Sequence, residues 1–200
     1  MRFGSVLLWF VCLGLAAATL RVLALPIALV MPAMAPYLPD FGWAVAGHIV
    51  GGPVALALVP FQLSARLRGA SLRRHRWLGY GYVLAVLVGA VAALALLPRF
   101  QGSAFAGVGF AMLAILWVGF TLRAVLAARA GDLAAHRRWM LRSVALTLAA
   151  VSLRLVMAPL MAAGWSLTET YDLTAWGSWL VNLALLEAVE YRRRTHPSEA

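Results

Sequence analysis

The sequence predicts an all-α integral membrane protein, a bundle of six transmembrane helices. Of the 200 residues, 64% are hydrophobic and the mean hydropathy is +0.87, whereas a soluble domain is usually about 45–50% apolar. Apolar segments recur along the chain, most of them near the length of about 20 residues that a helix needs to cross a bilayer. The basic residues collect in short blocks between these segments, as they do in membrane proteins.

The first three predicted spans are bounded by residues that a lipid-embedded helix avoids. The first, residues 5–31, ends at the proline-rich segment MPAMAPYLPDFG. The second, residues 43–63, runs from that segment to a block of arginines. The third, residues 77–98, begins after the block and ends at the turn-like PRFQGS.

The last three predicted spans follow the same rule. Residues 104–127 lie between PRFQGS and a second arginine block. Residues 139–162 follow that block and end before the polar segment GWSLTETYDLT. Residues 175–191 follow this segment and end at three consecutive arginines. No long linker interrupts the series, so we predict a single membrane domain over residues 1–200 with a polar tail at 192–200.

The start of the chain admits a second interpretation. MRFGSVLLWFVCLGLAAATL has a basic first turn, an apolar middle and small residues, as a secretory signal peptide does. Its cleavage would leave five transmembrane helices. The apolar run continues past Arg21 through VLALPIALVM, however, which is longer than a signal peptide needs. We therefore expect this segment to be retained as the first helix.

The arginines predict the orientation in the membrane. All 17 basic residues are arginines, and most lie after the second, fourth and sixth predicted spans. The opposite connectors hold Arg99 as their only basic residue, together with Asp40, Glu169 and Asp172. The positive-inside rule then places both termini in the cytoplasm. We expect a bacterial inner-membrane protein with lipid around it and no nucleic-acid partner, although the net charge is +10.

Two histidines stand at one predicted depth, near the cytoplasmic face. His75 and His136 each lie just before an apolar segment and follow similar arginine-rich loops. Two histidines at one level on separate helices satisfy the requirement for bis-imidazole ligation of haem b iron. The surrounding arginines are suited to haem propionates, a quinone headgroup or lipid phosphate. The alternative is that arginines and aromatic residues only anchor the protein at the interface.

A second group of polar residues falls within the predicted spans, in the outer leaflet. Its members are His48, Arg21, Arg154 and Asn182. Ionisable groups there are costly unless they are paired or face a cavity. One interpretation is a cofactor- or substrate-binding cavity in which the arginines hold an anionic group. The other is structural, with Arg154 bonded to Glu187 or a backbone carbonyl and His48 bonded between helices.

Two glycines lie one helical turn from His48. Gly51 and Gly52 follow it at i+3 and i+4 and leave the helix surface bare there. Such a surface suits close helix packing, a flat cofactor or a sugar ring, and we favour packing.

Four blocks carry a resemblance to a known family. They are GHIVGGPVALALVPFQ (47–62), RRHRWLGYGYVLAVLVGA (73–90), GDLAAHRRWMLRSVALTLAAVSLRL (131–155) and the pattern of Trp176, Trp179, Asn182 and Glu187. Over residues 43–191 the chain resembles the domain of unknown function 2306 family of bacterial multi-pass membrane proteins. The resemblance implies a membrane protein and no particular activity. A looser similarity is to transmembrane cytochrome b bundles, which usually hold haem between histidines within helices rather than at their mouths.

Two functions of different kinds follow from these residues. The first is haem- or quinone-linked electron transfer in the membrane. The second is a small transporter or membrane assembly factor that binds an anionic or lipid ligand in the outer-leaflet cavity. A purely structural bundle is the third interpretation. The chain contains no phosphate-binding glycine loop, HExxH sequence or serine nucleophile elbow, and the sequence leaves open whether the protein is an enzyme.

Overall fold

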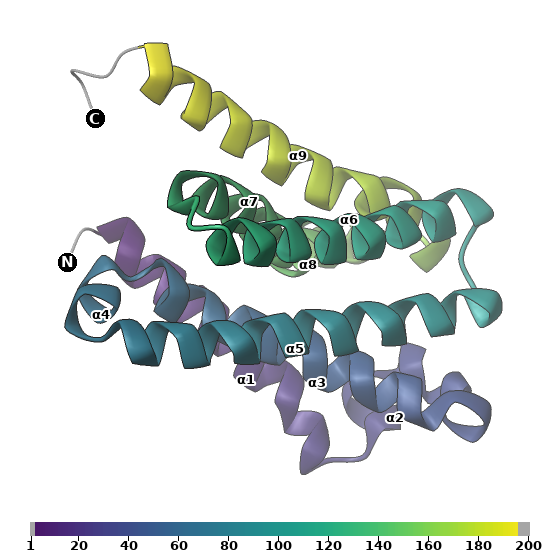
Figure 1. Ribbon diagram of the computed structural model, residues 1–200. Helices are drawn as coiled ribbons and strands as arrows, with labels where there is room; N and C mark the ends of the chain where they lie inside the picture. The colour runs from purple at the N-terminus through teal and green to yellow at the C-terminus, as the bar shows by residue number, and fades with distance from the viewer. Residues whose placement is uncertain (1–2, 196–200) are drawn as a thin grey trace. The chain divides into compact units, whose positions relative to one another are not determined.

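The computed structural model describes residues 3–195, which form helices joined by short turns and contain no β-strand (Figure 1). The predicted all-α class is confirmed. The contacts within the chain divide it into two compact units, residues 1–100 and 101–200. The boundary falls in the turn-like PRFQGS connector, where the sequence analysis expected one continuous domain.

The described residues of the first unit, 3–100, form three long helices and several short ones. The long helices are α1 (Phe3–Leu20), α3 (Leu38–Leu63) and α5 (Leu72–Leu96); the short elements are η1 (Arg21–Leu23), α2 (Ile27–Val30), η2 (Pro32–Tyr37), α4 (Ala65–Ala70) and η3 (Leu97–Arg99). Helix α3 packs along α5 over its length, and α1 packs against α3. The pairing of α3 with α5 therefore forms the centre of this unit.

The first helix is shorter than the predicted span 5–31. Helix α1 ends at Leu20, and the chain passes through η1 and a bend before α2 begins at Ile27. Pro26 precedes α2 with an extended ψ of 133°. A proline lacks the N–H that a helix requires and disfavours helical geometry in the residue before it. The apolar run is thus continuous in composition but not in structure.

The described residues of the second unit, 101–195, form four helices. They are α6 (Ala104–Arg129), α7 (Leu133–Thr147), α8 (Ala149–Ala162) and α9 (Leu167–Thr195). Helices α7 and α8 continue one another and are separated only at Leu148. The Thr147 hydroxyl donates to the Ser143 carbonyl at 3.0 Å, a side-chain bond that commonly bends helices. Helix α6 packs along α7, while α9 contacts α6, α7 and α8.

Helix α9 begins eight residues before the predicted span 175–191, because a capping box starts it at Leu167. The Ser166 hydroxyl accepts a hydrogen bond from the Glu169 N–H at 3.3 Å, and the Glu169 carboxylate accepts from the Ser166 N–H at 2.9 Å. This reciprocal bonding satisfies donors that a helix start leaves free. The segment read as a polar connector is therefore mostly helical. Of the predicted polar tail, residues 196–200 lie outside the described part.

We expect the pKa of Glu169 to lie below that of an ordinary glutamate. The hydrogen bonds from the Ser166 hydroxyl and N–H stabilise the charged carboxylate and lower the pKa. Because the folded pKa is depressed, the contribution of this cap to stability is present above the ordinary glutamate pKa and is lost as the pH falls through the depressed one. Carbon-13 NMR titration of the Glu169 carboxyl measures this pKa. Ser166→Ala should return it toward the ordinary value, and an unchanged pKa in that variant would contradict the assignment.

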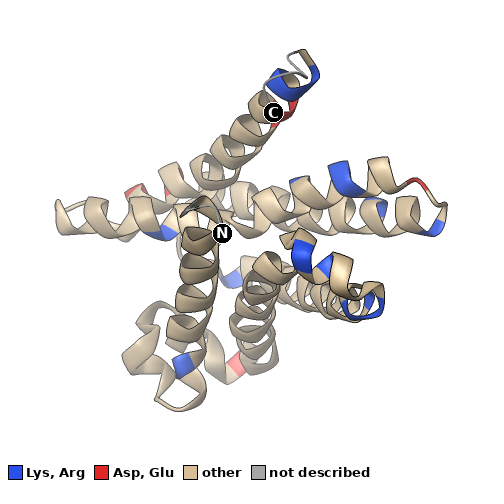
Figure 2. Cartoon of the chain, turned by 90° about the vertical axis from the view of Figure 1, so that its left-hand side faces the viewer, with Lys and Arg blue, Asp and Glu red and all other residues tan. Residues whose placement is uncertain are grey.

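Five helical segments within the described residues are long and apolar enough to cross a membrane. They are Gly4–Leu23, Pro32–Leu63, Leu72–Arg99, Ala104–Arg129 and Leu133–Ala162. These agree with the first five predicted spans, and the chain is a membrane protein with several apolar helices. Helix α9 has 29 residues, enough in length, but it carries more charge than the other five. Charged residues lie mostly toward the helix ends (Figure 2).

Candidate functional site

His75 and His136 occupy the same position of their helices. Each is the fourth helical residue, in α5 and α7 respectively. The caps also correspond, because the side chains of Ser71 and Asp132 each accept a bond from the backbone N–H three residues on. The sequence analysis placed both histidines just outside the apolar segments. The structure places them in the first helical turns, one in each unit.

The ring of His136 is held by a backbone carbonyl. Its Nδ1 lies 2.9 Å from the carbonyl oxygen of Ala124, a fully buried residue of α6. A carbonyl only accepts hydrogen bonds, so Nδ1 donates here and Nε2 is the ring nitrogen left for another partner. A metal-binding histidine characteristically has this arrangement, with one nitrogen donating to a carbonyl and the other facing the metal.

His75 is tied to the neighbouring helix through its backbone. The buried side chain of Gln62 donates from Nε2 to the His75 carbonyl at 3.2 Å. This bond joins the last turn of α3 to the first turn of α5. The ring is half-buried, and its Nδ1 is closed off from solvent. The first turn of α5 is thus held in place at the point where the imidazole projects.

The four predicted outer residues are divided between the units. Arg21 lies exposed in η1, directly after α1, and His48 lies half-buried on α3. Arg154 on α8 and Asn182 on α9 belong to the second unit. Each unit therefore contains two of the four residues.

Asn182 connects two helices. Its Oδ1 accepts from the Ser152 hydroxyl at 2.8 Å, and its Nδ2 donates to the Ala145 carbonyl at 3.0 Å. Ala145 lies on α7 and Ser152 on α8, so the amide spans the interruption at Leu148. Both ends of the side chain are thus used in helix packing.

Arg154 bonds to its own helix and not to Glu187. Its Nη1 donates to the Ala150 carbonyl at 2.9 Å, which agrees with the backbone-carbonyl alternative. Glu187 instead pairs with Arg142 at 2.7 Å. Arg154 lies about 18 Å farther along α7 and α8 than Arg142 at a rise of about 1.5 Å per residue, so the two arginines occupy different levels.

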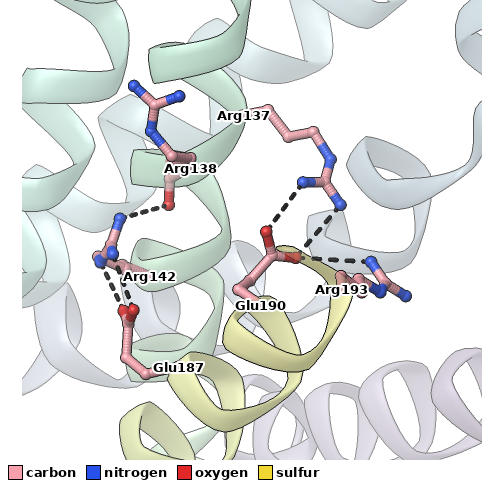
Figure 3. A network of polar contacts seen from close by, with 6 residues as sticks. All are labelled: Arg137, Arg138, Arg142, Glu187, Glu190 and Arg193. Carbon is pink, nitrogen blue, oxygen red and sulfur yellow. Dashed lines mark hydrogen bonds and ion pairs between the residues drawn. The ribbon is translucent and has the colours of Figure 1, made fainter. Parts of the chain in front are cut away.

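A network of charged residues between α7 and α9 was not predicted (Figure 3). Besides the pair of Arg142 with Glu187, Glu190 accepts from Arg137 at 3.3 Å and from Arg193 at 3.5 Å. Glu187 and Glu190 are three residues apart and share one face of α9. The three-residue spacing of these glutamates, together with the arginines of α7, is the sequence signal that indicates ion pairs between the two helices.

Aromatic and hydroxyl groups complete the packing between α6 and α7. Two guanidinium groups lie over the Trp139 ring, with the Cζ of Arg123 at 4.9 Å and the Cζ of Arg142 at 5.0 Å from the ring centroid. The hydroxyls of Thr121 and Ser143 lie 2.7 Å apart in the buried interior. These contacts satisfy polar groups inside an apolar unit and have a structural role.

No group of three or more His, Cys, Asp or Glu side chains among residues 3–195 is placed to hold a metal ion. This finding bears on sites built entirely from protein ligands. Haem iron takes its four equatorial ligands from the porphyrin and only axial ligands from the protein. Two histidines are therefore sufficient for haem.

The comparisons with known proteins identify the family. A family model described as "Predicted membrane protein (DUF2306)" matches residues 45–189, most of the chain. This agrees with the resemblance found in the four sequence blocks. No curated protein and no solved structure matches the chain. The chain belongs to the DUF2306 family of predicted membrane proteins.

Proposed function

We propose that the protein transfers electrons in a bacterial inner membrane with haem b, for which His75 and His136 are the candidate ligands. The observation that carries the proposal is the hydrogen bond from His136 Nδ1 to the Ala124 carbonyl, which fixes the ring and leaves Nε2 as the nitrogen that would bind iron. When bound, haem supplies one-electron chemistry at iron; the protein supplies ligands, orientation and charge.

The equivalent helix positions of the two histidines support the same proposal. Each imidazole projects from the first turn of a helix that then becomes strongly apolar. Two histidines would supply both protein ligands in bis-imidazole ligation of haem. Arg74 and Arg76 flank His75 and are exposed, and guanidinium groups pair well with carboxylates such as haem propionates. A quinone dissolved in the bilayer is the redox partner that we propose.

The visible spectrum tests this function. We expect full-length protein, expressed with ample haem supply and purified in detergent, to show a Soret band that shifts on reduction. His75→Ala and His136→Ala should each abolish the band. His196→Ala is the matched control and should retain it, because this histidine is not one of the candidate ligands and is far from both in the sequence. A protein without a Soret band would overturn the haem proposal.

A folding defect and a lost ligand are separated by adding imidazole. His136→Gly should fold, as judged by its elution from a gel-filtration column, and added imidazole should restore part of the band by replacing the missing ligand. Survival of the band in both His75→Ala and His136→Ala would assign the ligands elsewhere.

The second function that we propose is binding of an anionic ligand near Arg154, as in a small transporter or assembly factor. Its guanidinium is half-buried and has five N–H donors, of which one is used by the Ala150 carbonyl. A guanidinium inside an apolar region suits an anion. Arg154→Gln should then abolish anion binding in the purified protein while its unfolding temperature is kept. Loss of folding would make the arginine structural.

A further inference from the structure

The arginine-rich ends of α7 and α9 enclose an open groove within the second unit. Its volume is about 500 Å³, and its wall is made by Ala134, Arg137, Arg138, Glu190 and Arg194. Three guanidinium groups and one carboxylate give the wall a net charge of about +2. Ala134 is the second residue of α7, so the groove lies beside the start of this helix.

The positive charge of the groove is only partly neutralised by the protein. Glu190 is shared between Arg137 inside the groove and Arg193 beside it. Among residues 3–195, the guanidinium groups of Arg138 and Arg194 form no ion pair. In Figure 3 the Arg138 guanidinium projects away from the acidic residues, and only its backbone carbonyl is bonded, to Arg142. Two planar cations thus remain for a ligand.

We propose that this groove binds a phosphate group, that of an anionic phospholipid headgroup. The guanidinium fork matches two phosphate oxygens at once. Helix α7 leads from the groove directly into the apolar span Leu133–Ala162, so the groove lies where a lipid headgroup meets the hydrocarbon. Basic pockets beside transmembrane helices on the cytoplasmic side are typical sites for such headgroups.

The groove and His136 lie on different faces of α7. The His136 ring contacts Ala124 of α6, whereas the next residue, Arg137, contacts Glu190 of α9. Lipid binding in the groove is therefore independent of the haem proposal. Either can fail without the other.

The test is lipid binding by full-length protein in detergent, measured by native mass spectrometry. We expect phosphatidylglycerol to bind and phosphatidylcholine to bind far more weakly, because the latter has no net charge. Each groove arginine near an anionic headgroup contributes a factor of about five in affinity. Arg138→Gln combined with Arg194→Gln should therefore weaken phosphatidylglycerol binding by roughly 30-fold.

The matched control combines Arg66→Gln with Arg129→Gln. Both residues are exposed arginines that do not line the groove, and this double variant should bind phosphatidylglycerol as the wild type does. Equal binding of the two lipids, or an equal loss in the control, would overturn the proposal. Glu190→Gln removes the negative charge from the groove and should strengthen binding; weaker binding would contradict its electrostatic basis.

Inorganic phosphate distinguishes a lipid from a free anion. If the ligand is a lipid headgroup, inorganic phosphate should fail to displace phosphatidylglycerol when both are present at equal concentration. If inorganic phosphate at equal concentration displaces phosphatidylglycerol from the wild type, but not from the variant with Arg138→Gln and Arg194→Gln, the groove binds free phosphate. That result would overturn the lipid assignment.

Discussion

Gly51→Ala is expected to destabilise the pairing of α3 with α5 by about 3 kcal/mol, the upper end of the range of about 1–3 kcal/mol for an overpacked core. A Cβ at this position would lie 2.6 Å from the Gly89 nitrogen, 2.8 Å from the Gly89 Cα and 2.9 Å from the Ala85 carbonyl oxygen. All three are backbone atoms of α5, which no side-chain rotation can move. The two helices would have to move apart at this contact.

The adjacent glycine provides the control. A Cβ at Gly52 would meet no atom within 4 Å, so Gly52→Ala should change the free energy of unfolding by less than about 1 kcal/mol, with a small gain from helix propensity. Thermal unfolding of the purified protein in detergent, followed by circular dichroism at 222 nm, compares the variants. Equal destabilisation by the two substitutions would contradict the packing assigned to Gly51.

The different surroundings of the two glycines show where sequence reasoning stops. The pair after His48 predicted a bare helix surface, and close packing was the favoured interpretation. Adjacent residues in a helix point about 100° apart, so only one of them faces α5. Composition does not specify how a helix is rotated about its axis, because all sides of these segments are apolar. The small residues of the partner, Ala85 and Gly89, complete the contact only in three dimensions.

The helices themselves follow largely from the local sequence. The length and mean hydropathy of the apolar segments predicted the first five membrane-spanning helices. This works because the hydropathy of a segment is the sum of the contributions of its residues, whatever they contact. The errors lie at ends governed by single residues. Pro26 interrupts the first apolar run, and the reciprocal bonds of Ser166 with Glu169 start α9 early. Both signals are visible in the sequence but were outweighed there by average hydropathy.

The sequence predicted where the candidate ligands lie along the helices, but not which groups form hydrogen bonds or ion pairs with the charged and polar residues. The similar arginine-rich loops before His75 and His136 predicted that the two histidines occupy equivalent positions of their helices. In the structure, each is the fourth residue of its helix. The carbonyl of Ala124 that orients the His136 ring has no sequence signal, since every residue has a carbonyl. The partner of Glu187 was also missed, because Arg142 is distant in sequence and the facing register of two helices is set by packing.

Asn182→Leu is expected to destabilise the second unit by about 2 kcal/mol, because it removes two hydrogen bonds worth roughly 1 kcal/mol each. The amide joins the Ser152 hydroxyl on α8 to the Ala145 carbonyl on α7, across the interruption at Leu148. Leucine has a similar volume, so the loss would report hydrogen bonding more than packing. Thermal unfolding in detergent measures it.

A double-mutant cycle separates this structural role from the predicted role in ligand binding. Ser152→Ala removes one of the two bonds and should cost about 1 kcal/mol. Combined with Asn182→Leu it should cost less than the sum of the two single losses, because the variants share that bond. Strict additivity would contradict the bond between the two side chains. If Asn182 instead only bound a ligand, its amide would not contribute to the packing of α9 against α7 and α8. Asn182→Leu would then abolish ligand binding and leave the unfolding temperature unchanged.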